Sequence, residues 1–137
     1  MIEPLPASLR DDAVALWGEC GLTRPWNDPY ADLDRALAGP SSTVLAAVSE
    51  GSLLGTAMVG HDGHRGWVYY LAVAPAAQGS GLGRALMAAA EEWVAARGLP
   101  KLMLMVRGTN TAVLGFYERL GYVVEDTAVL GRRLDNP

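Results

Sequence analysis

The segment Gln78-Gly79-Ser80-Gly81-Leu82-Gly83-Arg84 carries the strongest chemical signal in the sequence. It follows an apolar, strand-like run and opens a helical pattern at about Gly81–Arg97. The start of a helix presents unpaired peptide N–H groups and a partial positive charge. Glycines let that backbone approach a ligand closely, and Arg84 adds a cation in the first turn. The segment is therefore predicted to hold an anion such as a phosphate or pyrophosphate.

Two common nucleotide-binding motifs do not fit this segment. A Rossmann fingerprint needs Gly-x-Gly-x-x-Gly early in the chain, whereas the spacing here is Gly79-x-Gly81-x-Gly83 and comes late. A P-loop needs Gly-Lys-Ser/Thr, and the sequence has no such triplet. A glycine-rich turn that binds nothing remains the structural alternative.

A second polar and aromatic segment runs from Asn110 to Tyr122. Asn110 is placed to cap a helix at about Thr109–Leu120 and to reach a ligand. Tyr117 comes seven residues later, on nearly the same helical face. The alternative for Tyr117 is a core aromatic whose hydroxyl is satisfied within the protein.

Together these two segments resemble the GNAT acetyltransferase family. The string Gln78-x-x-Gly81-x-Gly83 resembles its pyrophosphate-binding signature, and the Asn110–Tyr122 segment resembles its second CoA-contacting element. The resemblance covers about Ile2 to Leu134 and implies one GNAT domain over residues 1–137. It implies the acyl-CoA N-acyltransferase fold, an α/β (α+β) mixed sheet that is mostly antiparallel, with a central β-α-β crossover and helices on both faces. The implied function is direct transfer of an acetyl group from acetyl-CoA to an amine in a ternary complex.

The resemblance also implies roles for particular residues. Tyr117 would contact the cofactor and protonate the departing CoA thiolate as a general acid. In this family the strand before the glycine segment typically carries a bulge, whose free amide can stabilise an oxyanion. The implied cofactor-binding residues are Leu71, Ala72, Val73, Gln78, Gly79, Ser80, Gly81, Leu82, Gly83, Arg84, Asn110 and Tyr117.

The general base is the uncertain part of the predicted mechanism. Many family members carry a Glu on the strand before the glycine segment, but Trp67–Val73 contains no carboxylate. The nearby candidates for the base are Asp62, His64 and Tyr69 or Tyr70. His61, Asp62 and His64 in one loop are weak grounds for a metal, and none is predicted. The missing carboxylate also favours a second hypothesis, a non-catalytic acetyl-CoA-binding module acting as a sensor or partner subunit.

The proline-containing loop Arg24–Pro29 is predicted to form one wall of the site that binds the acceptor amine. Trp26 could pack on a substrate, Asp28 could hold a cation and Arg24 could bind a carboxylate. Alternatively, Trp26 fastens the loop to the core and Asp28 caps the next helix. Tyr69 and Tyr70 are further candidates for binding the acceptor. Together with Asp62–Gly66 and these tyrosines, the loop is similar to a bacterial GNAT subgroup labelled YpeA-like, a label that brings no settled substrate.

The composition indicates a folded domain and argues against nucleic acids and membranes as partners. Half of the 137 residues are hydrophobic, and the net charge of −4 gives no support to nucleic-acid binding. The single cysteine, Cys20, excludes an internal disulfide and fits a cytoplasmic location. No stretch is long and apolar enough to suggest a membrane partner. The predicted partners are an amine-bearing small molecule or a protein amine, and a homodimer is plausible by family habit alone.

Hydrophobic periodicity and turn residues predict the elements that position these groups. Ser8 is predicted to cap the first helix, which runs to Cys20, and a second helix covers about Pro29–Leu37. A glycine-rich loop is expected at Gly60–Gly66. The predicted strands are Ile2–Leu5, Thr43–Val48, Leu53–Val59, Trp67–Val73, Lys101–Val106, Tyr122–Val124 and Ala128–Leu134.

Overall fold

A computed structural model describes residues 2–135 of the chain, which divides into two compact units, Met1–Met105 and Val106–Pro137. The first unit contains a five-stranded sheet with the spatial order β1-β2-β3-β4-β5. Its strands are β1 (Ile2–Pro4), β2 (Ser42–Ser49), β3 (Ser52–His61), β4 (Gly66–Val73) and β5 (Leu102–Leu104). The mixed α/β architecture predicted from the sequence is confirmed.

The sheet is an antiparallel meander that ends in one parallel pair. Strands β1 to β4 pair antiparallel, and β2 turns into β3 at Glu50-Gly51. Helix α3 (Leu82–Ala95) then carries the chain over to β5, which pairs parallel with β4. This β-α-β crossover is confirmed, and it places the start of α3 directly after the end of β4.

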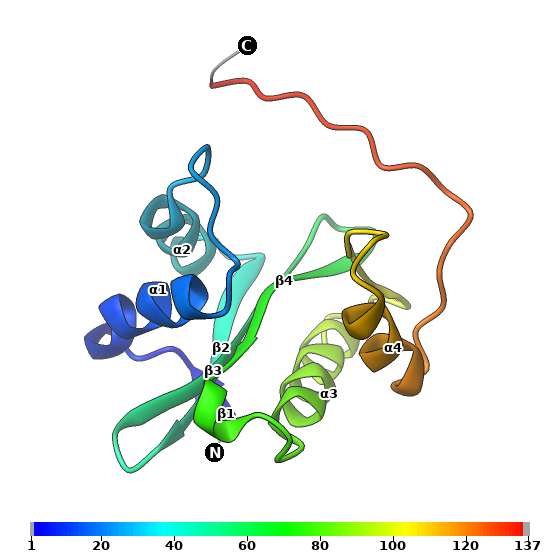
Figure 1. The fold of residues 1–137 in the computed structure, drawn as a ribbon. Coiled ribbons are helices and arrows are strands. Elements are labelled where there is room, and N and C mark those ends of the chain that lie inside the picture. The colour runs from blue at the N-terminus through cyan, green and yellow to red at the C-terminus, as the bar shows by residue number, and fades with distance from the viewer. Residues whose placement is uncertain (1, 136–137) are drawn as a thin grey trace. The chain divides into compact units, whose positions relative to one another are not determined.

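Helices cover both faces of the sheet in the first unit (Figure 1). Helices α1 (Arg10–Glu19) and α2 (Pro29–Ala38) pack on one face, where Trp17, Leu33 and Val44 are fully buried. Helix α3 packs on the other face, where Leu86 joins Ala57 and Ala47 in a second core cluster. Burial of these apolar side chains on two faces holds the sheet in place.

Two glycines allow α3 to lie very close to the sheet. A Cβ atom at Gly66 would lie 2.5 Å from Val94 Cγ2 of α3. A Cβ atom at Gly55 would lie 2.9 Å from Leu86 Cδ1 and 2.8 Å from the Ala72 carbonyl oxygen. All three distances are shorter than a Cβ atom tolerates, so the absence of side chains at Gly66 and Gly55 lets α3 pack closely against β3 and β4.

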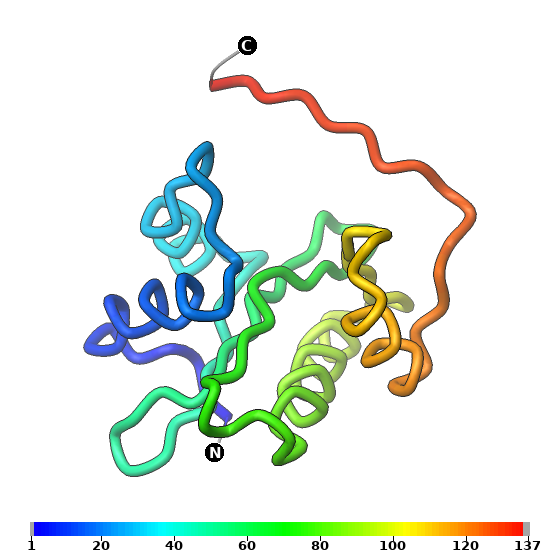
Figure 2. The backbone as a smooth tube through the Cα atoms, viewed as in Figure 1, coloured from blue at the N-terminus to red at the C-terminus, as the bar shows by residue number. Residues whose placement is uncertain are grey.

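The second unit contains helix α4 (Thr111–Arg119), followed by an extended chain (Figure 2). The predicted strands Tyr122–Val124 and Ala128–Leu134 are wrong, because neither forms a strand in the described part of the chain. Their apolar residues are mostly exposed, with Val123 at 81% and Leu130 at 88%. A strand is stabilised by pairing with a neighbour, and the described residues of the second unit form no strand.

Other boundaries differ from the sequence prediction by a few residues. Ser8 does not cap α1: it lies in a short 3₁₀ turn at Ala7–Leu9, and Leu9 precedes the helix with no side-chain cap. Strand β3 continues to His61 through pairing with β4, so the expected Gly60–Gly66 loop is shorter than predicted. These differences arise because tertiary pairing overrides local turn signals.

Candidate functional site

The glycine segment forms a tight turn that leads into α3. A single 3₁₀ turn, Pro75–Ala77, follows β4, and Gly81 is the residue before the helix. Gly79 and Gly81 have φ values of 83° and 87°, a left-handed conformation that side-chain-bearing residues adopt at a cost. Nothing lies within 4 Å of where their Cβ atoms would be. Glycine is therefore needed here for backbone conformation and for open approach, not for packing inside the protein.

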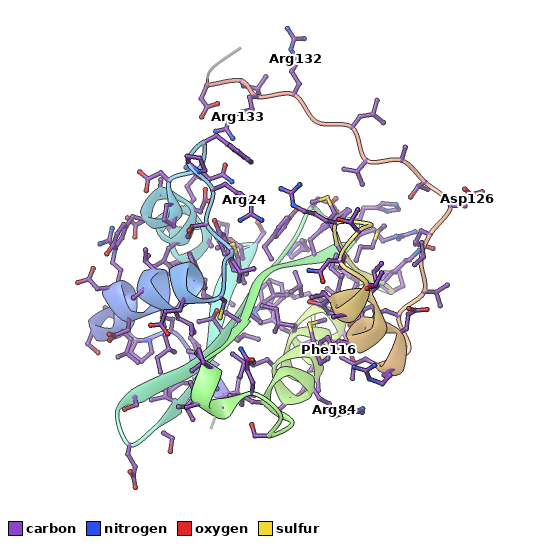
Figure 3. The ribbon with its side chains drawn as sticks, viewed as in Figure 1. Arg24, Arg84, Phe116, Asp126, Arg132 and Arg133 are labelled. Carbon is purple, nitrogen blue, oxygen red and sulfur yellow. The ribbon has the colours of Figure 1, made fainter. Side chains whose placement is uncertain are left out.

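The first turn of α3 has no side-chain cap. Gly81 contributes no oxygen to the first peptide N–H groups, and its carbonyl accepts the first helical bond from Ala85 at 3.1 Å. Arg84 is exposed and extends from this turn (Figure 3). The helix start thus combines bare N–H donors, the positive end of the helix dipole and a cation, as an anion site requires.

Strand β4 has an open edge beside this turn. Its parallel pairing with β5 stops at Val68 opposite Leu104, so Tyr69–Val73 has no β5 partner. The Ala74 N–H donates to the Leu54 carbonyl at 2.8 Å, and hydrogen-bonded pairs alternate in antiparallel sheets. Val73 therefore directs its N–H and C=O away from β3, toward the open edge. An extended ligand with amide groups can bind along such an edge as an added strand.

Two side chains already donate to the carbonyl of Val73. Gln78 Nε2 lies 3.1 Å from this oxygen, and Cys20 Sγ lies 3.4 Å from it. Burial raises the pKa of the Cys20 thiol, which keeps its proton available for this bond. The predicted residues Val73 and Gln78 are thus brought together, and Gln78 ties the glycine turn to the end of β4.

A β-bulge interrupts β4 just before Val73. Thr56 pairs with Ala72 and Met58 pairs with Tyr69, so Tyr70 and Leu71 both lie opposite Ala57. Tyr70 has a φ of 50°, which costs roughly 1–3 kcal/mol in a non-glycine residue. The bulge that the family resemblance implied is therefore present, and it coincides with local backbone strain.

Tyr70 is held at the bulge by residues that the sequence did not single out. Its ring stacks on Trp17 with centroids 3.9 Å apart, and its hydroxyl donates to Asp32 Oδ2 at 2.8 Å. Burial, followed by the hydrogen bond to Asp32, raises the pKa of Tyr70. Thr56 Oγ1 donates to the Tyr70 carbonyl and accepts from Trp17 Nε1, both at 2.9 Å. A polar Thr within the apolar run Leu53–Val59 was the available signal for this network.

In the loop between α1 and α2, Asp28 caps the next helix as one alternative predicted, but Trp26 does not fasten the loop to the core. Asp28 Oδ1 accepts from the peptide N–H groups of Tyr30 and Ala31, so Asp28 caps α2. Trp26 is 56% exposed, so it does not fasten the loop to the core. Arg24 Nη1 donates to the carbonyls of Gly21 and Thr23 at 2.8 and 2.9 Å, which orders the loop.

The loop between β3 and β4 carries the two predicted base candidates. Asp62 Oδ1 accepts from the peptide N–H groups of Arg65 at 2.8 Å and His64 at 2.9 Å. These bonds, led by that of Arg65, hold the pKa of the exposed Asp62 below its usual value. Asp62 is therefore ionised at neutral pH but is a weak proton acceptor. Tyr69, on the strand after this loop, is 45% exposed, and partial burial raises its pKa.

The predicted helix cap is confirmed in the second unit. Asn110 caps the helix, its Oδ1 accepting from the Val113 N–H at 3.3 Å. The Tyr117 ring packs edge-on against Phe116 and Tyr122, with centroids 5.0 and 5.8 Å away. Burial raises the pKa of Tyr117 to about 12, so its hydroxyl is protonated at neutral pH.

Residues 2–135 lack two features. No group of three or more His, Cys, Asp and Glu side chains is arranged to hold a metal ion. No helix among these residues has the length and apolar character needed to cross a membrane.

Comparison with known proteins identifies the family. The model of the Acetyltransferase (GNAT) family matches residues 7–122, which is most of the chain. The chain belongs to the GNAT acetyltransferase family. This GNAT N-acetyltransferase is an enzyme of class EC 2.3.1. It is 46% identical over 124 residues to an acetyltransferase of Yersinia enterocolitica, covering 90% of the chain and 88% of the relative. An acetyltransferase of Pectobacterium atrosepticum is 46% identical over 121 residues, covering 88% and 86%.

Solved structures share the fold of this GNAT acetyltransferase at low sequence identity. The aminoglycoside acetyltransferase AAC(6')-Iy, in complex with a bisubstrate analogue, superposes with a TM-score of 0.82 at 17% identity, covering 97% of both chains. Another structure of AAC(6')-Iy contains CoA, with a TM-score of 0.82 at 17% identity, covering 98% of this chain and 94% of that one. AAC(6')-IG from Acinetobacter haemolyticus superposes with a TM-score of 0.79 at 18% identity, covering 97% of both chains.

Proposed function

We propose that this GNAT enzyme transfers the acetyl group of acetyl-CoA directly to an amine within a ternary complex. The observation that carries the proposal is the uncapped start of α3 beside the open edge of β4. Bare peptide N–H groups at Gly79–Arg84 bind the pyrophosphate, and the guanidinium of Arg84 adds a charged contact. The resemblance to the family signature and the CoA complex of a protein with the same fold support this role.

The pantetheine arm of acetyl-CoA is proposed to extend along the open edge of β4. Its amides bond to backbone groups of Leu71 and Val73, in the manner of an added strand. The Val73 carbonyl accepts from the side chain of Gln78, and a pantetheine amide would replace that bond. Ala72 pairs with Thr56 of β3 and its side chain is buried in the core, so it contributes only the spacing between Leu71 and Val73.

The proposed chemical step joins the amine nitrogen to the acetyl carbonyl carbon. The neutral amine attacks, the carbonyl electron pair moves to oxygen, and a peptide N–H at the bulge of β4 stabilises the oxyanion. Collapse of this intermediate breaks the carbon–sulfur bond and releases the CoA thiolate. Tyr117 donates its hydroxyl proton to that thiolate, and a pKa of about 12 keeps the proton in place until the step occurs.

The attacking amine must lose a proton before or during the step. We propose the loop between β3 and β4 as the acceptor, with Asp62 and His64 as alternatives. The lowered pKa of Asp62 makes its carboxylate the weaker acceptor, so His64 is the first variant to test. A pH–rate profile of His64→Gln, compared with that of Asp62→Asn, separates the two.

The acceptor is proposed to be an amine on a small molecule or on a protein. Asp28 and Arg24 belong to the loop that forms one wall of its site, and Trp26 and Tyr69 offer exposed aromatic surface. Two proteins with the same fold are named as aminoglycoside acetyltransferases, which agrees with an amine acceptor. We further propose membership of the YpeA-like bacterial subgroup, a homodimeric state and, because the chain has one cysteine, a cytoplasmic location.

Release of CoA thiol from acetyl-CoA, measured over a panel of amines, tests the proposed function. Tyr117→Phe should lower kcat roughly 10- to 1000-fold while the dissociation constant for acetyl-CoA changes little. Tyr30→Phe is the control, because it removes a hydroxyl in α2 that donates to Asp11, outside the residues proposed for the site. An unchanged kcat in Tyr117→Phe would remove the proposed acid, and CoA binding without turnover of any amine would favour a non-catalytic module.

A further inference from the structure

Tyr70 and Glu50 are the residues other than glycine with positive φ in the described chain, at 50° and 51°. Glu50 lies in the exposed turn between β2 and β3, where tight hairpins often need this conformation. Tyr70 lies inside a strand, where a bulky aromatic residue rarely adopts it. Such strain persists only when surrounding contacts enforce it.

Contacts from three elements enforce the conformation of Tyr70. Trp17 of α1 stacks on the ring at 3.9 Å with an interplanar angle of 13°. Thr56 of β3, itself fully buried, donates to the peptide carbonyl, and Asp32 of α2 accepts from the hydroxyl. The ring, the carbonyl and the hydroxyl are therefore each held from a different direction. We call Trp17, Thr56 and Asp32 the Tyr70 clamp.

The clamped backbone directly precedes the peptide groups that the reaction uses. Tyr70 forms the bulge with Leu71, and Val73 lies two residues after Leu71 on the open edge of β4. We infer that Tyr70 is a positioning residue for acetyl transfer, because its locked backbone fixes the direction of the Leu71 peptide group. This inference rests on the proposed function. Its side chain faces the clamp, so Tyr70 acts through the strand rather than by touching the acceptor.

A pair of variants separates backbone positioning from loss of the ring. Tyr70→Gly and Tyr70→Ala both remove the side chain, but only glycine adopts positive φ freely. Tyr70→Ala should lower kcat roughly 10- to 100-fold, by analogy with loss of an oxyanion donor, with acetyl-CoA affinity within about threefold. Tyr70→Gly should retain on the order of fivefold more kcat than Tyr70→Ala. All rates are measured where circular dichroism shows each variant fully folded.

Glu50→Gly and Glu50→Ala provide the matched control, because Glu50 has the same φ but lies in an exposed turn. Their kcat values should be equal to that of the wild type. Equal kcat in Tyr70→Gly and Tyr70→Ala would overturn the inference, as would a raised KM for the amine with kcat unchanged. The latter result would make Tyr70 an acceptor-binding residue.

A binding measurement keeps the inference testable even if the wild type acetylates none of the amines. CoA is titrated into ¹⁵N-labelled protein, and the Leu71 amide resonance is followed. It should shift in the wild type and in Tyr70→Gly, and shift far less in Tyr70→Ala. The same shift in all three proteins would overturn the inference, whereas absence of turnover with an intact Leu71 response would overturn only the proposed reaction.

Discussion

Replacing Thr56 by valine should destabilise the protein strongly, although the two side chains have nearly the same size and shape. Thr56 is fully buried, and its hydroxyl accepts from Trp17 Nε1 and donates to the Tyr70 carbonyl, both at 2.9 Å. Valine keeps the shape but removes both bonds. A buried indole N–H left without an acceptor costs about 1–3 kcal/mol, and the lost bond to the carbonyl adds roughly 1 kcal/mol. The free energy of unfolding should therefore fall by roughly 2–4 kcal/mol.

Urea unfolding followed by tryptophan fluorescence measures this loss. Thr56→Ser is the matched variant, because it keeps the hydroxyl and removes one buried methyl group, at a cost of about 1 kcal/mol. Thr56→Ser should be clearly more stable than Thr56→Val. If Thr56→Val proved as stable as the wild-type protein, the two hydrogen bonds would contribute nothing, and Thr56 would not hold Tyr70 in place.

Gly66→Ala should lower the free energy of unfolding by about 1–3 kcal/mol, because its Cβ would overlap Val94, and Val94→Ala should recover part of this in a double-mutant cycle. Asp28→Ala should lower the free energy of unfolding, measured with urea, by about 1 kcal/mol, because α2 loses its N-cap. Asp28→Asn should lower it much less, because asparagine also caps helices. Burial raises the pKa of Tyr117 to about 12 against 10.0 in the unfolded chain, so unfolded Tyr117 loses its proton first. The free energy of unfolding should then fall by roughly 1–2 kcal/mol between pH 10 and pH 12. A fall of the same size in Tyr117→Phe would show that Tyr117 is not the group responsible.

Local sequence signals were sufficient for most of the fold and for the glycine turn. The alternation of apolar residues in β2, β3 and β4, and the glycines before α3, report directly on burial and backbone conformation. Asn110 was identified as a helix cap because capping depends on residues within one turn. The parallel pairing of β4 with β5 followed from the crossover connection.

Features that depend on contacts distant in sequence could not be predicted. The Tyr70 clamp joins α1, α2 and β3 to β4, and no local pattern links Trp17 or Asp32 to Tyr70. The predicted strand Ala128–Leu134 has an apolar pattern, but pairing with a neighbour decides whether a strand forms. The bulge of β4 came from the family resemblance alone, since a bulge depends on register with the partner strand.

The most direct test of the central claim is a titration of CoA into ¹⁵N-labelled protein, with backbone amide shifts mapped onto the sequence. If peptide N–H groups at the start of α3 bind the pyrophosphate, the largest shifts should occur at Gly79, Gly81, Leu82 and Gly83. Pantetheine, which lacks the pyrophosphate, should leave these amides largely unmoved while still shifting Leu71 and Val73. Saturable CoA binding with no change at the glycine turn, or no binding at all, would contradict the account.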